Sequence, residues 1–320
     1  MFLKKIADSI RSNQNITEKI EINPIVQYID ENSFKSNQIF TDIGEDSASI
    51  KDQNRLILIT TDRIRTDFIE SFPFGAGFSS ILVSVDDIYA CGGIPLAASI
   101  IISVKNVNTC SELLKGICEG SKKFKVPIIR GHTNIHSKCF ELSSTMIGEI
   151  SKEDYISAGN AQVGDSIILI VDLNGKIGKA NRLYYDTTTF KSSEEVLNNR
   201  KAMNLVAKKH IVHASKDISN GGIFGTILQM IKYSEVGADV TLTKITIPPI
   251  LEVNKYDLET YLKMYLTTSF ILTAENNRCK EIIELFERHE LHAEVIGKII
   301  EEKNLLRIND ESKSIDVLRF

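Results

Sequence analysis

Three clusters of carboxylates between residues 41 and 95 place the strongest constraint on how this chain can fold. They lie in a predicted turn, directly after an apolar run and inside a helix-like run, in that order: Glu45 and Asp46, Asp62, and Asp86 and Asp87. Side chains in such different settings meet only where a fold brings a turn, a strand end and a helix together. If they meet, they form a site suited to Mg²⁺ carrying nucleotide phosphates, because Mg²⁺ prefers oxygen ligands.

A purely structural role is the alternative for each cluster. An acidic turn is usually solvated, and an Asp before a helix usually caps it. Asp87 argues against this alternative, because its neighbours on the predicted helix are apolar almost all round and an unpaired Asp is rare in a buried helix. We therefore predict a functional role for Asp87 and also for Asp46 and Asp62. Glu45 and Asp86 stay open between the two roles.

The bulk composition is that of an ordinary globular protein with room for two cores. The chain has 320 residues, of which 25% are charged and 42% hydrophobic, and its formal net charge is −4. It contains no long basic block, so we predict neither a nucleic acid nor an anionic membrane as a partner. No apolar run approaches the ~20 residues of a membrane span, and the first residues predict an amphipathic helix and not a signal peptide.

The cysteines indicate a reducing compartment. There are five of them, with no CxxC pair and no zinc-like spacing to a histidine. This pattern predicts reduced, mostly structural thiols in a cytoplasmic protein. One reactive cysteine is the alternative.

Apolar runs and helical periods alternate along the chain, which predicts an α/β or α+β fold. Predicted strands cover residues 56–60, 96–104, 126–130, 139–150, 166–171, 266–273 and 293–300. Predicted helices cover residues 2–12, 17–30, 75–92, 111–124, 193–208, 223–233 and 277–289. Predicted loops include 72–77, 130–134 and 213–222. The polar stretch 151–161 divides the chain, which predicts two domains, 1–155 and 156–320.

Two of the predicted loops carry groups that could bind an anion. In the first, Gly131 permits close approach of the backbone, Thr133 offers a hydroxyl and Arg130 offers a fork that matches phosphate. His132 between them could be a base, a phosphate ligand or a structural side chain. The second loop, 217–222, leads into a helix whose glycine-rich start could bind an anion through free N–H groups. A plain helix cap there is the structural alternative.

Several common site signatures are absent from the sequence. Neither GxxxxGK[ST] nor a GxGxxG turn after a strand occurs, so a bound nucleotide would not lie on a Walker loop. Neither GxSxG nor HExxH occurs, which excludes the common serine-hydrolase and zinc-protease motifs.

Five motifs in order resemble the aminoimidazole ribonucleotide (AIR) synthetase superfamily, which includes thiamine-monophosphate kinase, selenophosphate synthetase and a hydrogenase maturation dehydratase. They are GEDSA at 44–48, TTD at 60–62, VSVDDIYACG at 83–92, GHT at 131–133 and KDISNGG at 216–222. The stretches DTTTFKS at 186–192 and KDISNGGIFGT at 216–226 look most like the subgroup that includes methanogenesis marker protein 2. The resemblance covers nearly the whole chain.

The resemblance implies a two-domain α/β fold of the AIR synthase type. The N-terminal sheet would pair with that of a second copy, so that a homodimer encloses a β-barrel at its interface. ATP with Mg²⁺ would bind in the cleft between the domains, with its phosphates near the acidic clusters. The expected partners are ATP and an unidentified small-molecule acceptor.

The resemblance and the chemistry of the residues together predict roles for individual positions. The resemblance itself implies those of Asp46, Asp62, Asp87, Gly131, Thr133 and Asp217. The carboxylates of the metal site would be Asp46, Asp62, Asp87 and Glu45. Nucleotide-binding positions would be Gly44, Arg130, Gly131, Thr133, Ser219 and Asn220. His132 and Asp217 would be the catalytic side chains, and Lys191 and Lys216 are further candidates for phosphate contacts.

The chain departs from the superfamily patterns at several positions. His132 stands where the kinase has Asp, and Asn220 replaces the second Asp of DISDG. LTTSFIL at 266–272 replaces the kinase's GEDYEL, which argues against thiamine phosphate as the substrate. The Cys/Sec–Lys segment of selenophosphate synthetase and the C-terminal Cys of the dehydratase are not in the sequence, so neither of those activities is expected.

Three hypotheses follow from this sequence. The first is an ATP- and Mg²⁺-dependent phosphotransferase or synthetase that acts on an oxygen of a small molecule, a reaction that needs mainly positioning and charge neutralisation. The second is a catalytically silent, dimeric nucleotide-binding protein that assists the maturation of a metalloenzyme. The third is an unrelated α/β scaffold with structural acidic turns.

Overall fold

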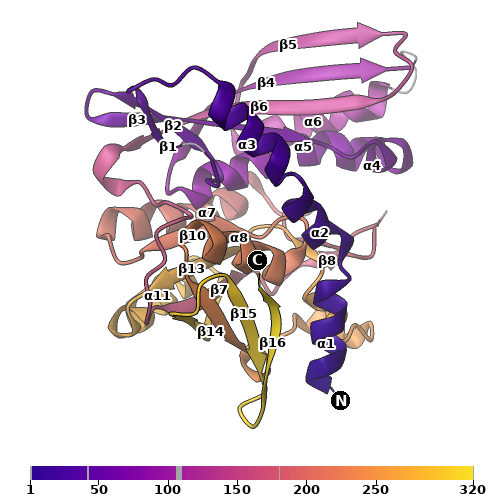
Figure 1. Cartoon of the computed structure of the whole chain (residues 1–320). Helices are drawn as coiled ribbons and strands as arrows, with labels where there is room; N and C mark the ends of the chain where they lie inside the picture. Colours follow the sequence, from indigo (N-terminus) through magenta and orange to yellow (C-terminus); the bar gives the residue numbers. More distant parts are fainter. Residues whose placement is uncertain (1, 42, 106–109, 180, 320) are drawn as a thin grey trace.

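The computed structural model describes residues 2–41, 43–105, 110–179 and 181–319, and two large mixed sheets dominate it (Figure 1). The first sheet has the strand order β1-β2-β3-β6-β4-β5. Its strands are β1 (Ile39–Thr41), β2 (Ala48–Asp52), β3 (Arg55–Arg63), β4 (Ile94–Val104), β5 (Ile128–Ile135) and β6 (Glu141–Ser151). All its neighbouring pairs are antiparallel except β4 and β5.

Helices cover one face of the first sheet: α4 (Thr66–Ser71), α5 (Pro73–Ala90) and α6 (Cys110–Phe124) (Figure 1). Burial alternates along β6, which is typical of a strand with one covered face. Helix α5 is buried almost throughout, because α6 packs against it where Gly77 and Gly116 leave room. A Cβ at Gly77 would lie 2.1 Å from the Leu113 carbonyl oxygen, and one at Gly116 would lie 2.0 Å from that of Phe74.

The second sheet has the strand order β10-β13-β7-β14-β11-β15-β16. Its strands are β7 (Ser166–Val171), β10 (Ala214–Asp217), β11 (Gly237–Thr241), β13 (Phe270–Ala274), β14 (His292–Ile300), β15 (Leu305–Asn309) and β16 (Ser314–Arg319). Strand β7 is buried at every residue and apolar from Ile167 to Val171, as expected for a strand covered on both faces. A small third sheet is formed by β12 (Tyr265–Leu266), β9 (Tyr184–Asp186) and β8 (Lys176–Ile177).

The helices of this second half are α7 (Ser193–Lys209), α8 (Gly222–Tyr233), α9 (Pro249–Val253), α10 (Leu258–Tyr261) and α11 (Cys279–Glu287). Short 3-10 turns occur at Lys152–Asp154, Leu242–Lys244 and Asn276–Arg278. Helix α7 begins with a capping box between Ser192 and Glu195, as its sequence predicts. Apolar side chains of α5, α7 and both large sheets form one continuous cluster, which joins the two halves.

The N-terminal helices pack mainly on the second half of the chain. They are α1 (Phe2–Arg11), α2 (Gln14–Glu21) and α3 (Asn23–Asn32). Leu3, Ile6 and Ile10 of α1 lie in the apolar core that contains Ile167. Nε of Arg11 donates to the carbonyl of Val317 in β16, at 2.6 Å. Helix α3 crosses toward the first sheet, and all its residues are exposed or half-buried (Figure 1).

The sequence-based description of the fold is confirmed in its main features. The chain is a mixed α/β protein with one large sheet before residue 152 and another after residue 165. The predicted boundary between 1–155 and 156–320 stays a prediction. Helix α1 lies in the first of these segments, but its apolar side chains pack in the core of the second half. Among the described residues, no helix is long and apolar enough to cross a membrane.

Three predicted loops are wrong. Most of 72–77 is the first turn of α5, which begins at Pro73, a residue suited to the first helical position. Residues 130–134 lie within β5 and not after it. Residues 214–217 form β10, whose residues are all buried, so the functional part of this segment begins inside a strand. In each case glycine or polar residues predicted a loop, whereas packing against distant segments decides the outcome.

Candidate functional site

Three carboxylates from distant parts of the chain converge between the two halves. Asp46 lies in the turn between β1 and β2, Asp87 lies on α5 and Asp217 ends β10. One oxygen from each lies within 4.8 Å of the other two. The fold therefore brings a turn, a helix and a strand end together, as predicted for such a site. The strand end is that of β10, with Asp217, and not the predicted one with Asp62.

Hydrogen bonds fix the orientation of these carboxylates. The backbone N–H of Asp217 donates to Asp46 Oδ2 at 3.1 Å, which ties the turn of the first half to β10 of the second. The hydroxyl of Thr60, on β3, donates to Asp87 Oδ2. Lys216 forms an ion pair with Asp46, and both of these side chains are nearly buried. The site is thus held by groups from both halves of the chain.

Asp62 lies on β3 next to this triad of Asp46, Asp87 and Asp217. Ser84 of α5 donates to Asp62 Oδ2 at 2.8 Å, and the Ser84 and Ser144 hydroxyls lie 2.8 Å apart. The hydroxyl of Ser144 in turn donates to the carbonyl of Ser80. Burial raises the pKa of Asp62 above its ordinary value, although the hydrogen bond from Ser84 opposes that shift.

The electrostatics of the triad favour a bound cation. Burial, and then repulsion from Asp62 and Asp217, raises the pKa of Asp87 well above its ordinary value. Burial, and then repulsion from Asp46, does the same to the pKa of Asp217. A divalent cation would relieve this repulsion. The donor set consists of oxygens only, which fits a hard cation such as Mg²⁺.

Two lysines face the triad from different segments. Burial alone would lower the pKa of Lys216, but Asp46 and Asp217 raise it above the ordinary value, so Lys216 stays charged. Burial and then Lys216 lower the pKa of Lys19, on α2, to about 8, while Asp217 and Asp46 oppose the shift. Lys19 was not predicted as a site residue, because nothing in the sequence of α2 distinguishes it from a surface lysine.

Asp86 and Asp87 have different environments although they are neighbours. Asp86 points toward α7 and pairs with Arg200, with 2.7 Å between Oδ1 and Nε. The side chain of Arg200 is fully buried. Of the two roles left open for Asp86, this buried ion pair supports the structural one.

Glu45 does not join the triad of its neighbour Asp46. Its carboxylate accepts from the Ser157 hydroxyl at 2.6 Å and from the Ala158 backbone N–H at 2.7 Å. Burial raises the pKa of Glu45 above its ordinary value. Glu45 thus holds the segment between the two large sheets, and its predicted metal role gains no support from this geometry.

The predicted phosphate loop, Arg130 to Thr133, lies at the free edge of the first sheet. Its residues are exposed, and β5 is the last strand of the sheet. Asp62, Ser144, Ile100 and Gly131 are successive partners across four strands. Three strand spacings separate Gly131 from Asp62, or about 14 Å. His132 and Thr133 follow Gly131 along this edge, so the structure does not bring them to the triad.

The remaining predicted positions lie around the start of α8 and the first turn. Ser219 is half-buried and its hydroxyl accepts from Lys19 Nζ at 3.4 Å, whereas Asn220 is exposed. Gly44 has φ +94°, and a Cβ there would lie 2.4 Å from the ring of Tyr233. Gly44 is therefore required for packing against α8, whatever else it does.

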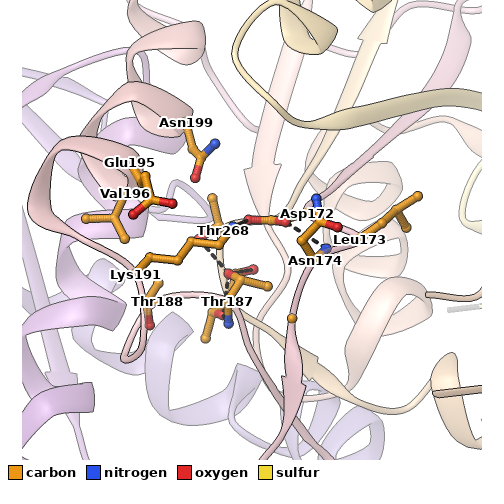
Figure 2. A network of polar contacts seen from close by, with 12 residues as sticks. Asp172, Leu173, Asn174, Thr187, Thr188, Lys191, Glu195, Val196, Asn199 and Thr268 are labelled. Atoms are coloured by element: carbon orange, nitrogen blue, oxygen red, sulfur yellow. Dashed lines mark hydrogen bonds and ion pairs between the residues drawn. The ribbon is translucent and has the colours of Figure 1, made fainter. Parts of the chain in front are cut away.

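Lys191, a candidate phosphate contact, belongs to a different network. It pairs with the fully buried Asp172 after β7, beside Thr187 and Thr268 (Figure 2). The hydroxyl of Thr187 donates to that of Thr268 at 2.9 Å. This network connects the loop before α7 to the segment before β13, so the structure gives Lys191 a structural partner.

Comparison with known proteins agrees with this architecture. Residues 44–150 match the model of the AIR synthase related protein N-terminal domain, and residues 162–307 match that of its C-terminal domain. An uncharacterized protein of Methanocaldococcus jannaschii is 37% identical over 98% of this chain and 96% of its own length. The thiamine-monophosphate kinase of Buchnera aphidicola is 26% identical over 85% of this chain and 89% of its own.

A solved structure shares the fold at low sequence identity. The PurL protein of T. maritima complexed with ATP superposes with a TM-score of 0.76 at 14% identity. The match covers 99% of this chain and 51% of that one. The chain thus spans about half the length of this structural relative.

Proposed function

The chain belongs to the AIR synthase related protein family, and from this premise we propose that it is an ATP- and Mg²⁺-dependent enzyme. It would transfer a phosphoryl group to an oxygen of a small molecule or activate such an oxygen. The convergence of Asp46, Asp87 and Asp217, with Asp62 beside them, is the observation that carries this proposal. A thiamine-monophosphate kinase among the relatives supports phosphoryl transfer as the reaction type.

The carboxylates and Lys216 would have different roles in such a reaction. The three triad carboxylates would hold Mg²⁺, and the ion would neutralise charge on the phosphates. Asp46 is fixed by the N–H of Asp217 and by Lys216, so its position is set before a ligand arrives. Lys216 places a permanent positive charge beside the phosphates.

We propose that the protein is a homodimer, with the first sheet paired to that of a second copy to close a β-barrel. Five large apolar side chains of β4 and β5 are between 40% and 67% exposed: Ile94, Leu96, Ile101, Ile129 and Ile135. These side chains form an exposed apolar face that ends at the edge strand β5, and such a face favours packing against another chain. The dimer would put Gly131, His132 and Thr133 at the interface.

A measurement of the oligomeric state tests the proposed homodimer directly. We expect light scattering after size-exclusion chromatography to give twice the 35.8 kDa mass of the chain. Ile129→Glu should shift the mass toward the monomer, because it places a charge in the apolar interface. A monomeric wild type at micromolar concentration would contradict the homodimer.

A catalytically silent nucleotide-binding protein is the second candidate. The position of His132 favours it, because Gly131, the neighbour of this predicted base, lies about 14 Å across the sheet from Asp62. The neutral and exposed Asn220 favours it as well. Release of ADP from Mg-ATP with any small-molecule acceptor separates the first candidate from this one.

Asp87→Asn tests the ligand site. In the wild type, Mg-ATP at 100 times its dissociation constant should stabilise the fold by about 2.7 kcal/mol, visible as a higher unfolding temperature. Asp87→Asn should lose this Mg²⁺-dependent shift. Asp8→Asn, on the exposed surface of α1, is the matched control and should keep it. Asp87 suits the test better than Asp46, whose loss would also unpair the buried Lys216.

Asp87→Asn should remain folded, because the ionised Asp87 carboxylate lowers the stability of the fold at neutral pH. Its pKa is raised in the folded protein, so the folded state keeps a proton that the unfolded chain releases near the ordinary Asp pKa. Stability therefore falls as the pH rises from that value toward the raised one. Asp87→Asn removes this loss, and its unfolding temperature without ligand should equal or exceed that of the wild type. An undiminished Mg-ATP shift in the variant would refute the site, and no shift in the wild type would refute ATP binding.

A further inference from the structure

Helix α2 lies directly on the first turn of α8, at the edge of the carboxylate site. Ile16 of α2 is buried, and the surface below it is formed by Gly221 and Gly225. A Cβ at these glycines would lie 3.5 and 3.6 Å from Cγ1 of Ile16, and 3.7 and 3.9 Å from Cε of Lys19. The stem of Lys19 therefore lies over the glycines, and its ammonium is carried toward the loop before α8.

The ammonium of Lys19 is held by two neutral side chains. It donates to Gln229 Oε1 at 2.6 Å and lies 3.4 Å from the Ser219 hydroxyl. Among the described residues, the hydrogen-bond partners of this ammonium are neutral oxygens. A partly buried ammonium in such a setting gains from an anionic ligand, because the charged form loses hydration there. Gln229 and Ser219 fix the head of Lys19 without neutralising its charge.

The surroundings of Lys19 contain further positive charge. Lys216 is close enough to repel it. Helix α8 has 12 residues and Gly221 as its N-cap, and no side chain of a described residue caps its start. The positive end of the helix dipole thus lies next to two lysines. These groups adjoin the carboxylates that would hold a metal ion, so the arrangement suits a ligand that is both metal-bound and strongly anionic.

We propose that Lys19 is a ligand of the terminal phosphates of the bound nucleotide and that α2 completes the site. This assignment rests on the proposed function and adds to it a residue from a segment that precedes both matched domains. Lys19 would contact the β- or γ-phosphate as a point charge, while the carboxylates hold the metal on the other side.

The test compares ATP, ADP and AMP, each with Mg²⁺, on wild type, Lys19→Ala and Lys19→Arg. Lys4→Ala, which removes an exposed lysine of α1, is the charge-matched control. Isothermal titration should show ATP binding weakened about 10- to 100-fold in Lys19→Ala, the usual worth of a charged hydrogen bond. AMP affinity should be nearly unchanged, and Lys19→Arg and Lys4→Ala should bind ATP like the wild type.

The outcomes separate this assignment from the proposed function. If the wild type binds no nucleotide, both fail. If the wild type binds Mg-ATP and Lys19→Ala binds it equally well, only the role of Lys19 fails. Equal weakening of ATP, ADP and AMP would show that Lys19 acts on the charge of the whole site and not on the terminal phosphates, which also overturns the assignment. Circular dichroism of Lys19→Ala and the behaviour of Lys19→Arg exclude misfolding as the cause.

Discussion

Replacement of Asp86 by Ala is expected to destabilise the protein by about 3–5 kcal/mol, the usual effect of leaving one member of a buried ion pair without its partner. Arg200 is the group left behind. Its side chain is fully buried, its Nη1 donates to the Val196 carbonyl at 3.0 Å, and its guanidinium lies over the ring of Phe124. These contacts hold the cation in place, so it cannot turn to water when Asp86 is removed.

Urea denaturation at neutral pH measures this effect. The double variant Asp86→Leu/Arg200→Met should be more stable than Asp86→Ala, because an apolar pair of similar volume needs no compensating charge. The folded fraction of Asp86→Ala should still bind Mg-ATP, in contrast to Asp87→Asn. A loss below about 1 kcal/mol for Asp86→Ala would place this pair with ordinary surface ion pairs and contradict the prediction.

Lys191→Met is expected to have an effect of similar size at the network shown in Figure 2. Asp172 has no exposed side-chain surface and Lys191 has 11%. The variant would leave a buried carboxylate that, within the described part of the chain, keeps one hydrogen bond, from the N–H of Asn174 at 2.9 Å. Breaking such a pair typically costs about 3–5 kcal/mol. The loop before α7 would lose its anchor on the end of β7.

A surface pair provides the control for Lys191→Met. Lys209 and Glu281 are 2.8 Å apart, but their side chains are 48% and 38% exposed. Lys209→Met should therefore change the free energy of unfolding by only about 0–1 kcal/mol. Equal losses in both lysine variants would show that burial does not set the strength of the Asp172–Lys191 pair.

Much of the architecture could be predicted from local patterns. Strand β7 is apolar from Ile167 to Val171 and helix α7 carries a capping box, and these signals predict the positions of both elements. Residues 130–134 were misplaced because their polar character reflects an exposed strand edge. Exposure of an edge strand depends on what pairs beside it, which a window of sequence does not contain.

The candidate site was predictable only in part, for a similar reason. The apolar surroundings of residues 86 and 87 indicated a buried helix, and they did so equally for both carboxylates. Arg200, which lies 114 residues from Asp86 in sequence, pairs with Asp86 and thereby distinguishes it from Asp87. Glu45 is likewise separated from Asp46 by its partner Ser157, 112 residues away. Lys19 carries no local signal, since its importance comes from the helix start on which it lies.

The bond between Arg11 and the carbonyl of Val317 has a consequence for the order in which the protein forms during synthesis. A ribosome releases the chain from its N-terminal side, so Arg11 of α1 emerges 306 residues before Val317 of the strand that receives it. Until then its apolar face of Leu3, Ile6 and Ile10 has no permanent cover. Helix α1 is therefore docked only after all the segments between it and β16 have been made, and its apolar face needs protection in the nascent chain until then.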